Sequence, residues 1–192
     1  MIVDNYILVK ENFFPHSFLD QVVKRGLDSK EVEAELSGGR INKEMRDTRI
    51  TWLNDVWIYD WILPLVHEMN EEANWNFSID YPEEIQFTKY KENHFYNWHQ
   101  DDIHKSDDSI NEQRKISVVI PLSNSDEYEG GDLEFCDPTA SPIKKEKIIS
   151  KDIFRQKGNM VVFPSFVYHR VTKVTKGQRL SMVMWIRGEK WK

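Results

Sequence analysis

The part of the chain from residue 76 onward alternates short β-favouring runs with turns, and this alternation limits the fold more than any other feature of the sequence. The runs are rich in the β-branched and aromatic residues that suit a pleated sheet. Many short strands separated by turns are typical of a β-sandwich or a jelly roll. The predicted strands are residues 76–79, 85–90, 96–99, 115–122, 132–135, 160–163, 168–174 and 180–187.

Two of these runs are apolar on both faces. They are KISVVIPL at residues 115–122 and LSMVMWI at residues 180–186. A strand that faces water on one side alternates polar and apolar residues, whereas a nearly continuous apolar run indicates a strand that is covered on both sides. We therefore expect both strands at the centre of the fold, with helices packed on one face.

The front of the chain, residues 1–75, has the periodicity of helices. One helix is predicted to begin near Ser17, a residue type that caps helices, and to run to about residue 27. A second is predicted from residue 54 or 55 to about residue 73. Pro64 lies inside it, so we expect a kink or two helices that meet there. An apolar stripe at spacings of four supports this second helix: Trp57, Trp61, Leu65 and Met69.

The length of 192 residues suits one domain with a sizeable core. We predict a single domain over residues 1–192, mostly β with flanking α-helices. Residues 1–75 would form its helical part and residues 76–192 its jelly-roll core. Hydrophobic residues make up 40% of the chain and charged residues 30%, which is ordinary for a folded domain.

Charge and cysteine content exclude several classes of protein. The net charge of −6 argues against broad nucleic-acid binding, which needs a basic surface, and nothing favours an anionic membrane. Cys136 is the only cysteine, which points to a reducing compartment. The N-terminus does not have the pattern of a signal peptide, and no apolar run reaches the length of about 18 residues that a membrane span needs. We expect a cytoplasmic protein, or one in the cytoplasm of a host cell if a phage encodes it; the oligomeric state is left open.

Two polar stretches interrupt the predicted strands, residues 102–113 and 138–157. Long loops in a compact domain are often lids or binding loops. Plain solvated connections are the alternative, and the sequence does not say which of the two stretches acts as a lid.

A candidate metal site begins with His99 and Asp101, at the end of a predicted strand. Residues two apart in a strand point to the same face, so the imidazole and the carboxylate project together. His169, at the start of a later strand, is the candidate third ligand. Two histidines and one carboxylate on one side of a metal are typical of non-haem Fe(II) oxygenases, in which the open positions bind a co-substrate and O2. The alternative is a surface histidine beside acidic residues such as Asp102.

Arg179 and Ser181 share a face at the start of the last predicted strand. The planar guanidinium of Arg matches a carboxylate, and Ser adds a hydroxyl donor. A dicarboxylate that chelates the metal at one end needs such a clamp at the other. The alternative is an Arg at a strand edge that pairs with an acidic neighbour. The tight turn expected at Gly177 favours the clamp, because it would set Arg179 beside the strand that carries His169.

Several segments, taken in order, resemble the prolyl 4-hydroxylase-like 2-oxoglutarate/Fe(II) oxygenases, and the bacterial and phage members of that group most of all. The resemblance covers about residues 85–187, and residues 46–53 (RDTRITWL) add a less specific match upstream. The matching segments are FTKYKENHFYNWHQD at 87–101, RKISVVIPLS at 114–123, YEGGDLEF at 128–135, GNMVVFPS at 158–165, HRV at 169–171, VTKGQRLS at 174–181 and WI at 185–186.

The resemblance implies a fold, a set of ligands and a reaction. The fold would be a double-stranded β-helix, a cupin-like jelly roll, with helices on one side. Fe(II) would be bound by His99, Asp101 and His169. Arg179 would bind the distal carboxylate of the co-substrate 2-oxoglutarate, and Tyr90 and Ser181 would support that carboxylate. The reaction would convert 2-oxoglutarate and O2 to succinate and CO2 while a C–H bond is hydroxylated, with ascorbate as a further reductant in some settings.

The substrate is a separate question, because fold and cofactor do not fix it. By analogy with the family, the first hypothesis is a peptidyl residue such as proline. The same chemistry on a free amino acid, a small metabolite or a modified nucleobase is the second. A jelly-roll binding module without activity is the third, although it would not require the full set of ligand residues. A peptide, protein or small molecule is thus the expected partner.

Aromatic residues near the predicted metal site could exclude water from it. Tyr96, Trp98 and Phe163 are candidates for such a wall, and simple core filling is the alternative. Arg170 should point away from His169 if their strand is regular. His94 and His104 flank the site in sequence, but proximity alone does not make them ligands.

Overall fold

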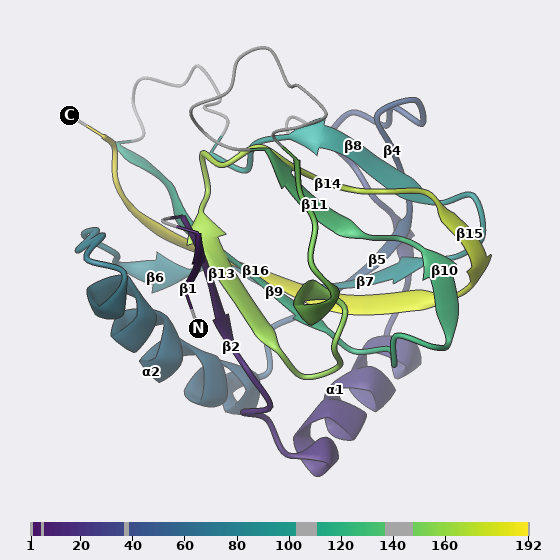
Figure 1. Ribbon diagram of the computed structural model, residues 1–192, viewed down its shortest axis with the longest axis horizontal. Helices are drawn as coiled ribbons and strands as arrows, with labels where there is room; N and C mark the ends of the chain where they lie inside the picture. Colours follow the sequence, from purple (N-terminus) through teal and green to yellow (C-terminus); the bar gives the residue numbers. More distant parts are fainter. Residues whose placement is uncertain (1, 5, 37–38, 103–110, 137–147, 192) are drawn as a thin grey trace.

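The computed structural model describes residues 2–4, 6–36, 39–102, 111–136 and 148–191 (Figure 1). Of the two predicted loops, 102–113 and 138–157, residues 103–110 and 138–147 lie outside the described residues. In chain order the elements are β1 (Ile2–Asp4), β2 (Ile7–Lys10), α1 (His16–Asp28), β3 (Val32–Glu33), β4 (Arg46–Asp47), β5 (Arg49–Leu53), α2 (Val56–Glu72), β6 (Tyr81–Pro82), β7 (Ile85–Tyr90), β8 (Phe95–His99), β9 (Glu112–Pro121), β10 (Tyr128–Gly130), β11 (Leu133–Cys136), β12 (Ile148–Ile149), the 3-10 helix η2 (Asp152–Phe154), β13 (Met160–Pro164), β14 (His169–Val171), β15 (Val174–Gly177) and β16 (Arg179–Glu189).

Two antiparallel sheets and a small ribbon make up the β structure of the described residues. The large sheet has the order β1-β2-β13-β9-β16-β7-β5-β3, with β6 paired to β16. The second sheet has the order β12-β11-β14-β8-β4, and β10 pairs with β15. Both helices cover one face of the large sheet, and β8, β14 and β11 lie over its other face (Figure 1). The prediction of a mostly β jelly roll with flanking helices is confirmed.

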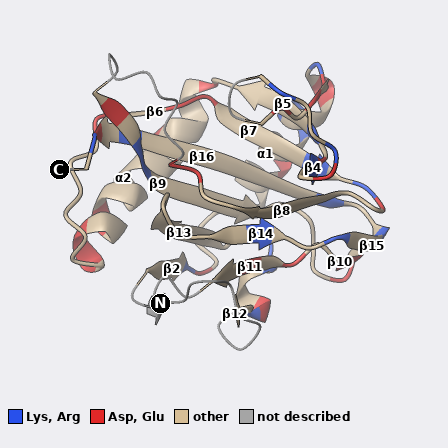
Figure 2. Ribbon diagram, turned by 90° about the horizontal axis from the view of Figure 1, so that it is seen from above, with Lys and Arg blue, Asp and Glu red and all other residues tan. Residues whose placement is uncertain are grey.

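Strand alternation divides the core into two clusters. On β9, Ile116, Val118 and Ile120 belong to the cluster beneath the helices, whereas Val119 belongs to the cluster between the sheets. β9 and β16 are buried along most of their length, as their apolar runs predict. Each large apolar side chain buried in this way stabilises the fold by about 1.5–3 kcal/mol. Charged residues are spread over the helices, the loops and the ends of several strands (Figure 2).

The two helices differ in detail from the prediction. Pro15, not Ser17, occupies the N-cap of α1, and no side chain caps this end. A proline is suited to this point because its φ is fixed and it has no N–H. Gly26 inside α1 lets the helix approach the sheet, because a Cβ there would lie 2.4 Å from the ring of Phe87. Helix α2 is continuous through Pro64, so the two-helix alternative is wrong.

The strands also differ from the prediction in places. The front of the chain is helical only in part, because β2 and β5 join the large sheet by pairing with β13 and β7. Residues 76–79 form no strand, and the short β6 follows them. The predicted strand 168–174 is divided into β14 and β15, which belong to different sheets. No helix in the described ranges is long and apolar enough to cross a bilayer.

Candidate metal and co-substrate site

The second sheet brings the two candidate histidine ligands side by side. His99 is the last residue of β8 and His169 the first of β14, and the two are direct partners in the antiparallel pair. Asp101 follows β8, where its main-chain N–H donates to the carbonyl of Ser165 at 2.8 Å. Residues 70 positions apart in sequence therefore meet at one end of the second sheet, facing the large sheet.

The three side chains converge on one point. Asp101 Oδ1 lies 3.6 Å from Nε2 of His99, and Oδ2 lies 3.4 Å from Nε2 of His169. One ligand atom from each residue lies within 4.8 Å of the others, and within the described part of the chain this is the group of His, Cys, Asp and Glu that could hold a metal ion. Both histidines are buried, at 6% and 5% exposure. A single cation between them would contact two nitrogens and one oxygen.

Hydrogen bonds fix the imidazoles in the form that a metal requires. Nδ1 of His99 donates to the carbonyl of Asn97 at 2.8 Å, and Nδ1 of His169 donates to the carbonyl of Val167 at 2.9 Å. This leaves the lone pair of each Nε2 directed at the shared point. Burial lowers the pKa of His99 to about 3, with the charge of His169 acting in the same direction. His99 is therefore neutral at pH 7.

Asp101 is ionised and held in place. Burial would raise the pKa of its carboxyl, but His169, His99 and Arg114 outweigh burial and lower the pKa to about 2. Ser117 donates from its Oγ to Asp101 Oδ2 at 2.7 Å, and Ser165 lies 2.9 Å from the same hydroxyl. Sequence reasoning gave no role to Ser117. The available signal was a serine within the apolar run 115–122, at a position that faces the space between the sheets.

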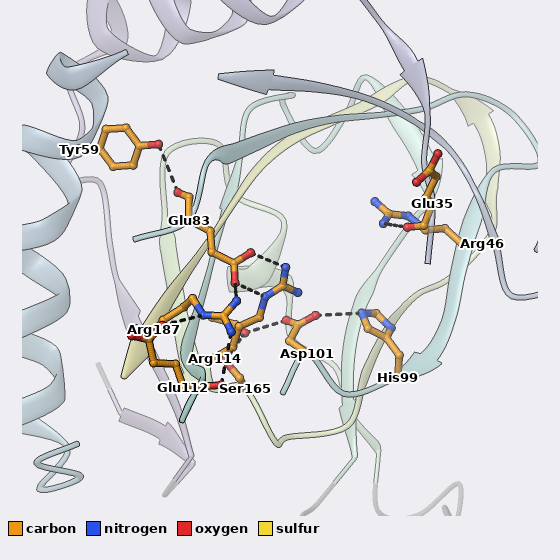
Figure 3. A network of polar contacts seen from close by, with 11 residues as sticks. Glu35, Arg46, Tyr59, Glu83, His99, Asp101, Glu112, Arg114, Ser165 and Arg187 are labelled. Atoms are coloured by element: carbon orange, nitrogen blue, oxygen red, sulfur yellow. Dashed lines mark hydrogen bonds and ion pairs between the residues drawn. The ribbon is translucent and has the colours of Figure 1, made fainter. Parts of the chain in front are cut away.

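An ionic network stands next to Asp101 (Figure 3). Arg114 donates through Nε and Nη2 to the two carboxylate oxygens of Glu83, at 2.8 and 2.6 Å, and Arg187 donates to the same carboxylate at 3.1 Å. Arg114 also lies over the ring of Trp185, 3.8 Å from its centroid. The network holds a positive charge near Asp101 with its own counter-ion in place.

The predicted aromatic wall is correct for two of its three members. Tyr96 stacks on His99 with centroids 3.5 Å apart, and Phe163 contacts His169 at 4.7 Å. Trp98 does not contribute, because it contacts Arg170, which projects away from His169 as predicted and pairs with Glu134. The register between β8 and β14 shifts between His99 and Tyr96, so both face inward despite their odd spacing.

Arg179 is the second feature of the site. The residue is 2% exposed, and its Nη1 donates to Ser181 Oγ at 3.0 Å. It lies over the ring of Tyr90, 5.3 Å from the centroid, and Tyr90 is its direct partner across β7 and β16. No carboxylate of the described residues pairs with this buried charge, which does not fit the alternative of a strand-edge ion pair. The structure thus groups Arg179, Tyr90 and Ser181, as it groups the three candidate metal ligands.

Glycines shape the backbone around Arg179. Gly131 has φ +63°, and a Cβ there would lie 3.1 Å from Cδ of Arg179 and 2.9 Å from a methyl of Val174. Gly177 has φ +75° and forms the turn before Arg179, as its position in the sequence indicated. Both conformations are ones that residues with a side chain rarely adopt.

The two groups border the same cluster between the sheets, because Tyr90, which contacts Arg179, and Phe163, which contacts His169, both belong to it. Tyr90 is buried, and burial raises the pKa of its hydroxyl; Arg179 opposes this shift while Asp101 adds to it. The Tyr90 hydroxyl therefore lies within the electrostatic range of both groups. His94 is not part of the cluster of candidate ligands, and His104 lies outside the described residues.

Two imidazoles and one carboxylate at a buried strand end define a site of the non-haem Fe(II) type. The model of the 2OG-Fe(II) oxygenase superfamily matches residues 85–187, and the chain belongs to this superfamily. It is the family of Fe(II)- and 2-oxoglutarate-dependent oxygenases, in which O2 is the second co-substrate.

Similar proteins agree with this assignment. A PKHD-type hydroxylase of Xylella fastidiosa (strain M12) is 29% identical over 108 residues, which are 53% of this chain and 43% of that protein. The chain spans less than half the length of the curated relatives it matches.

Two solved structures show the same fold. The 2-oxoglutarate complex of a viral collagen prolyl hydroxylase from Paramecium Bursaria Chlorella virus-1 has a TM-score of 0.68 at 20% identity, covering 95% of this chain and 96% of that one. A prolyl hydroxylase from Trichoplax adhaerens, in complex with a peptide fragment of hypoxia inducible factor, has a TM-score of 0.75 at 16% identity, covering 95% and 83%.

Proposed function

We propose that the chain is a 2-oxoglutarate-dependent hydroxylase in which His99, Asp101 and His169 bind Fe(II) and Arg179 binds the distal carboxylate of 2-oxoglutarate. One arrangement carries the proposal: three ligand atoms within 4.8 Å of one another border the same inter-sheet cluster as a buried guanidinium that has no carboxylate partner among the described residues. A dicarboxylate would join the two groups, with one end on the metal and the other neutralising Arg179.

The donor set fits Fe(II). When bound, the metal supplies the O2 chemistry that side chains alone do not perform. The carbonyls of Asn97 and Val167 hold the two imidazoles with Nε2 unprotonated. Ser117 holds the Asp101 carboxylate at 2.7 Å, so that it enters the site in one orientation. A shell of this kind usually raises metal affinity by 10- to 100-fold.

The co-substrate end of the site is arranged by packing and hydrogen bonds. Ser181 accepts from Nη1 of Arg179 and leaves the remaining donors of the guanidinium free for a carboxylate. Tyr90 packs against the guanidinium and keeps its own proton, because burial raises the pKa of its hydroxyl. Tyr96 and Phe163 surround the histidines with aromatic surface, which excludes water from the reacting groups.

For the substrate, we propose a peptidyl residue such as proline. Support comes from the proteins of similar fold, which include prolyl hydroxylases, one of them solved with a peptide. The alternative is that the same site hydroxylates a free amino acid or a small metabolite. The two hypotheses differ in which molecule stimulates the reaction.

Succinate formation tests the proposal. Fe(II)-loaded protein with 2-oxoglutarate and O2 should form succinate faster when a proline-containing peptide is present, and the peptide should gain the mass of one oxygen atom. His99→Ala and Asp101→Ala should abolish both products. Stimulation by a small molecule but by no peptide would refute the peptidyl substrate, and no turnover under any condition would favour a binding module without activity.

A further inference from the structure

A second buried guanidinium lies in the site and has no role in the function proposed above. Arg46, on β4, is 6% exposed. Its Nε has no hydrogen-bond partner, and its Nη1 reaches the main-chain oxygen of Glu35 only at 3.5 Å. A buried charge in this condition destabilises the folded chain unless something neutralises it.

Two half-buried arginines of the described chain show what a structural role requires. Arg114 has the carboxylate of Glu83. Arg155 pairs with Asp132 and donates to the carbonyls of Gly130 and Tyr128, at 2.8 and 3.1 Å. Arg46 has no carboxylate within ion-pair distance in the described ranges. In this respect it resembles Arg179, to which the proposed function assigns an external carboxylate.

The position of Arg46 indicates what it would bind. Its guanidinium lies over the ring of Tyr96, 4.5 Å from the centroid, and Tyr96 stacks on His99. In Figure 3 Arg46 lies on the same side of the network as His99, with its guanidinium directed at the main chain of Glu35. A group bound to Arg46 is therefore separated from a candidate metal ligand by a single aromatic ring.

We propose that Arg46 binds a carboxylate of the substrate that is hydroxylated, and thereby selects a substrate with an acidic group close to the reacting C–H bond. The inference deepens the proposed function and rests on it. A carboxylate neutralises the buried charge and matches the planar fork of the guanidinium, whereas a peptide carbonyl would leave the charge uncompensated. The carboxylates of 2-oxoglutarate already have partners, in Arg179 and the metal.

Matched acid and amide probes test this proposal by binding alone. The protein is loaded with Zn(II) and 2-oxoglutarate, which prevents turnover, and probe binding is measured by calorimetry. The pairs are L-proline and L-prolinamide, glycyl-L-proline and its amide, and the acetylated amides of Pro-Asp and Pro-Asn. The three pairs distinguish which carboxylate Arg46 binds: that of a free amino acid, that of a peptide C-terminus, or that of an acidic side chain.

At least one acid should bind about tenfold or more tightly than its amide, and Arg46→Met should remove the preference while it leaves the affinity for 2-oxoglutarate within about twofold. The proposal is overturned if no acid binds more tightly than its amide, if such a preference persists in Arg46→Met, or if no probe binds at all. Loss of 2-oxoglutarate affinity in Arg46→Met as large as in Arg179→Met also overturns it, because Arg46 would then serve the co-substrate.

Stability provides a second readout, with Arg155 as the matched control. Arg155 lies over the ring of Tyr128 at 4.4 Å, almost as Arg46 lies over Tyr96, but it has its carboxylate partner. Arg46→Met should leave the melting temperature unchanged or raise it, whereas Arg155→Met should lower it by roughly 6 °C or more. Equal destabilisation by both variants, or failure of Arg46→Met to fold, would show a structural role and overturn the proposal.

The two proposals can fail separately. If acids bind more tightly than amides because of Arg46 but no succinate forms under any condition, the carboxylate site at Arg46 is supported and the hydroxylase function is refuted. If succinate forms and acid and amide substrates react equally well, the hydroxylase function is supported and the carboxylate site at Arg46 is refuted.

Discussion

Replacing Arg179 by methionine removes the proposed anchor for 2-oxoglutarate and keeps the length and apolar body of the side chain. In the structure the residue is 2% exposed and its guanidinium donates to Ser181 alone among the described residues. Truncating one partner of a buried, hydrogen-bonded charge pair costs about 2–5 kcal/mol. This corresponds to a loss of affinity between about 30-fold and a few thousand-fold. We expect the lower end, about 30- to 100-fold, because Ser181 and Tyr90 remain to hydrogen-bond the carboxylate.

The assay is an anaerobic titration of 2-oxoglutarate into Fe(II)-loaded protein, followed by calorimetry. Fe(II) affinity, measured by competition with a chelator, should change by less than about threefold, because Arg179 contacts none of the candidate ligands. Arg170→Met is the matched control. Arg170 is next to His169 in sequence but points away from the site and pairs with Glu134. Its removal should leave the dissociation constant of 2-oxoglutarate within about twofold of the original.

A dissociation constant for 2-oxoglutarate that is unchanged in Arg179→Met would refute the anchor assignment. An equal loss of Fe(II) and 2-oxoglutarate binding would also refute it, because the arginine would then act through the fold. The melting temperature separates these outcomes: it should not fall in Arg179→Met, since the variant removes a buried charge without a carboxylate partner in the described structure.

Three further predictions follow from the geometry. Ser117→Ala removes the 2.7 Å hydrogen bond to Asp101 and should weaken Fe(II) binding by about tenfold in a chelator competition; unchanged affinity would mean that Asp101 needs no such support. Gly131→Ala places a Cβ against Arg179 at a φ of +63° and should lower the free energy of unfolding by about 1–3 kcal/mol while weakening 2-oxoglutarate binding, as urea denaturation and calorimetry would show. The His99 pKa is lowered from 6.5 to about 3, so the unfolded chain takes up this proton first as the pH falls. The free energy of unfolding of the metal-free protein should therefore fall by about 1.4 kcal/mol between neutral pH and pH 5.5. In His99→Gln this decrease should be smaller; an equal decrease in the variant would show that His99 does not cause it.

Strand parity explains why part of the site could be predicted from sequence. Two residues apart at a strand end, His99 and Asp101 were expected on one face, and the structure brings them together. Parity alone would place Tyr96, three residues from His99, on the opposite face; one extra residue in β8 turns it inward, and no local signal in the sequence marks this irregularity. Trp98, adjacent to His99, faces away as parity requires, and its expected role in the wall was wrong because it rested on nearness in sequence alone. Parity also placed Arg179 beside Ser181.

Long-range pairing explains what could not be predicted. Arg46 enters the site through a two-residue strand that pairs with Tyr96 and Phe95, about 50 positions away, and such a short strand has no periodicity of its own. The strands β2 and β5 were missed for a related reason. Each is only four or five residues long and lies beside a helix in sequence, so its identity as a strand depends on the edge of the large sheet to which it pairs.

Crystals grown without oxygen with Fe(II) and 2-oxoglutarate would test the central claim most directly, with iron located by anomalous scattering. We predict one iron per chain, bound by Nε2 of His99, Nε2 of His169 and one oxygen of Asp101, with the 2-keto acid end of 2-oxoglutarate on the metal and the distal carboxylate on Arg179. Iron bound elsewhere, a metal sphere filled by additional protein ligands, or a co-substrate that does not reach Arg179 would contradict this prediction.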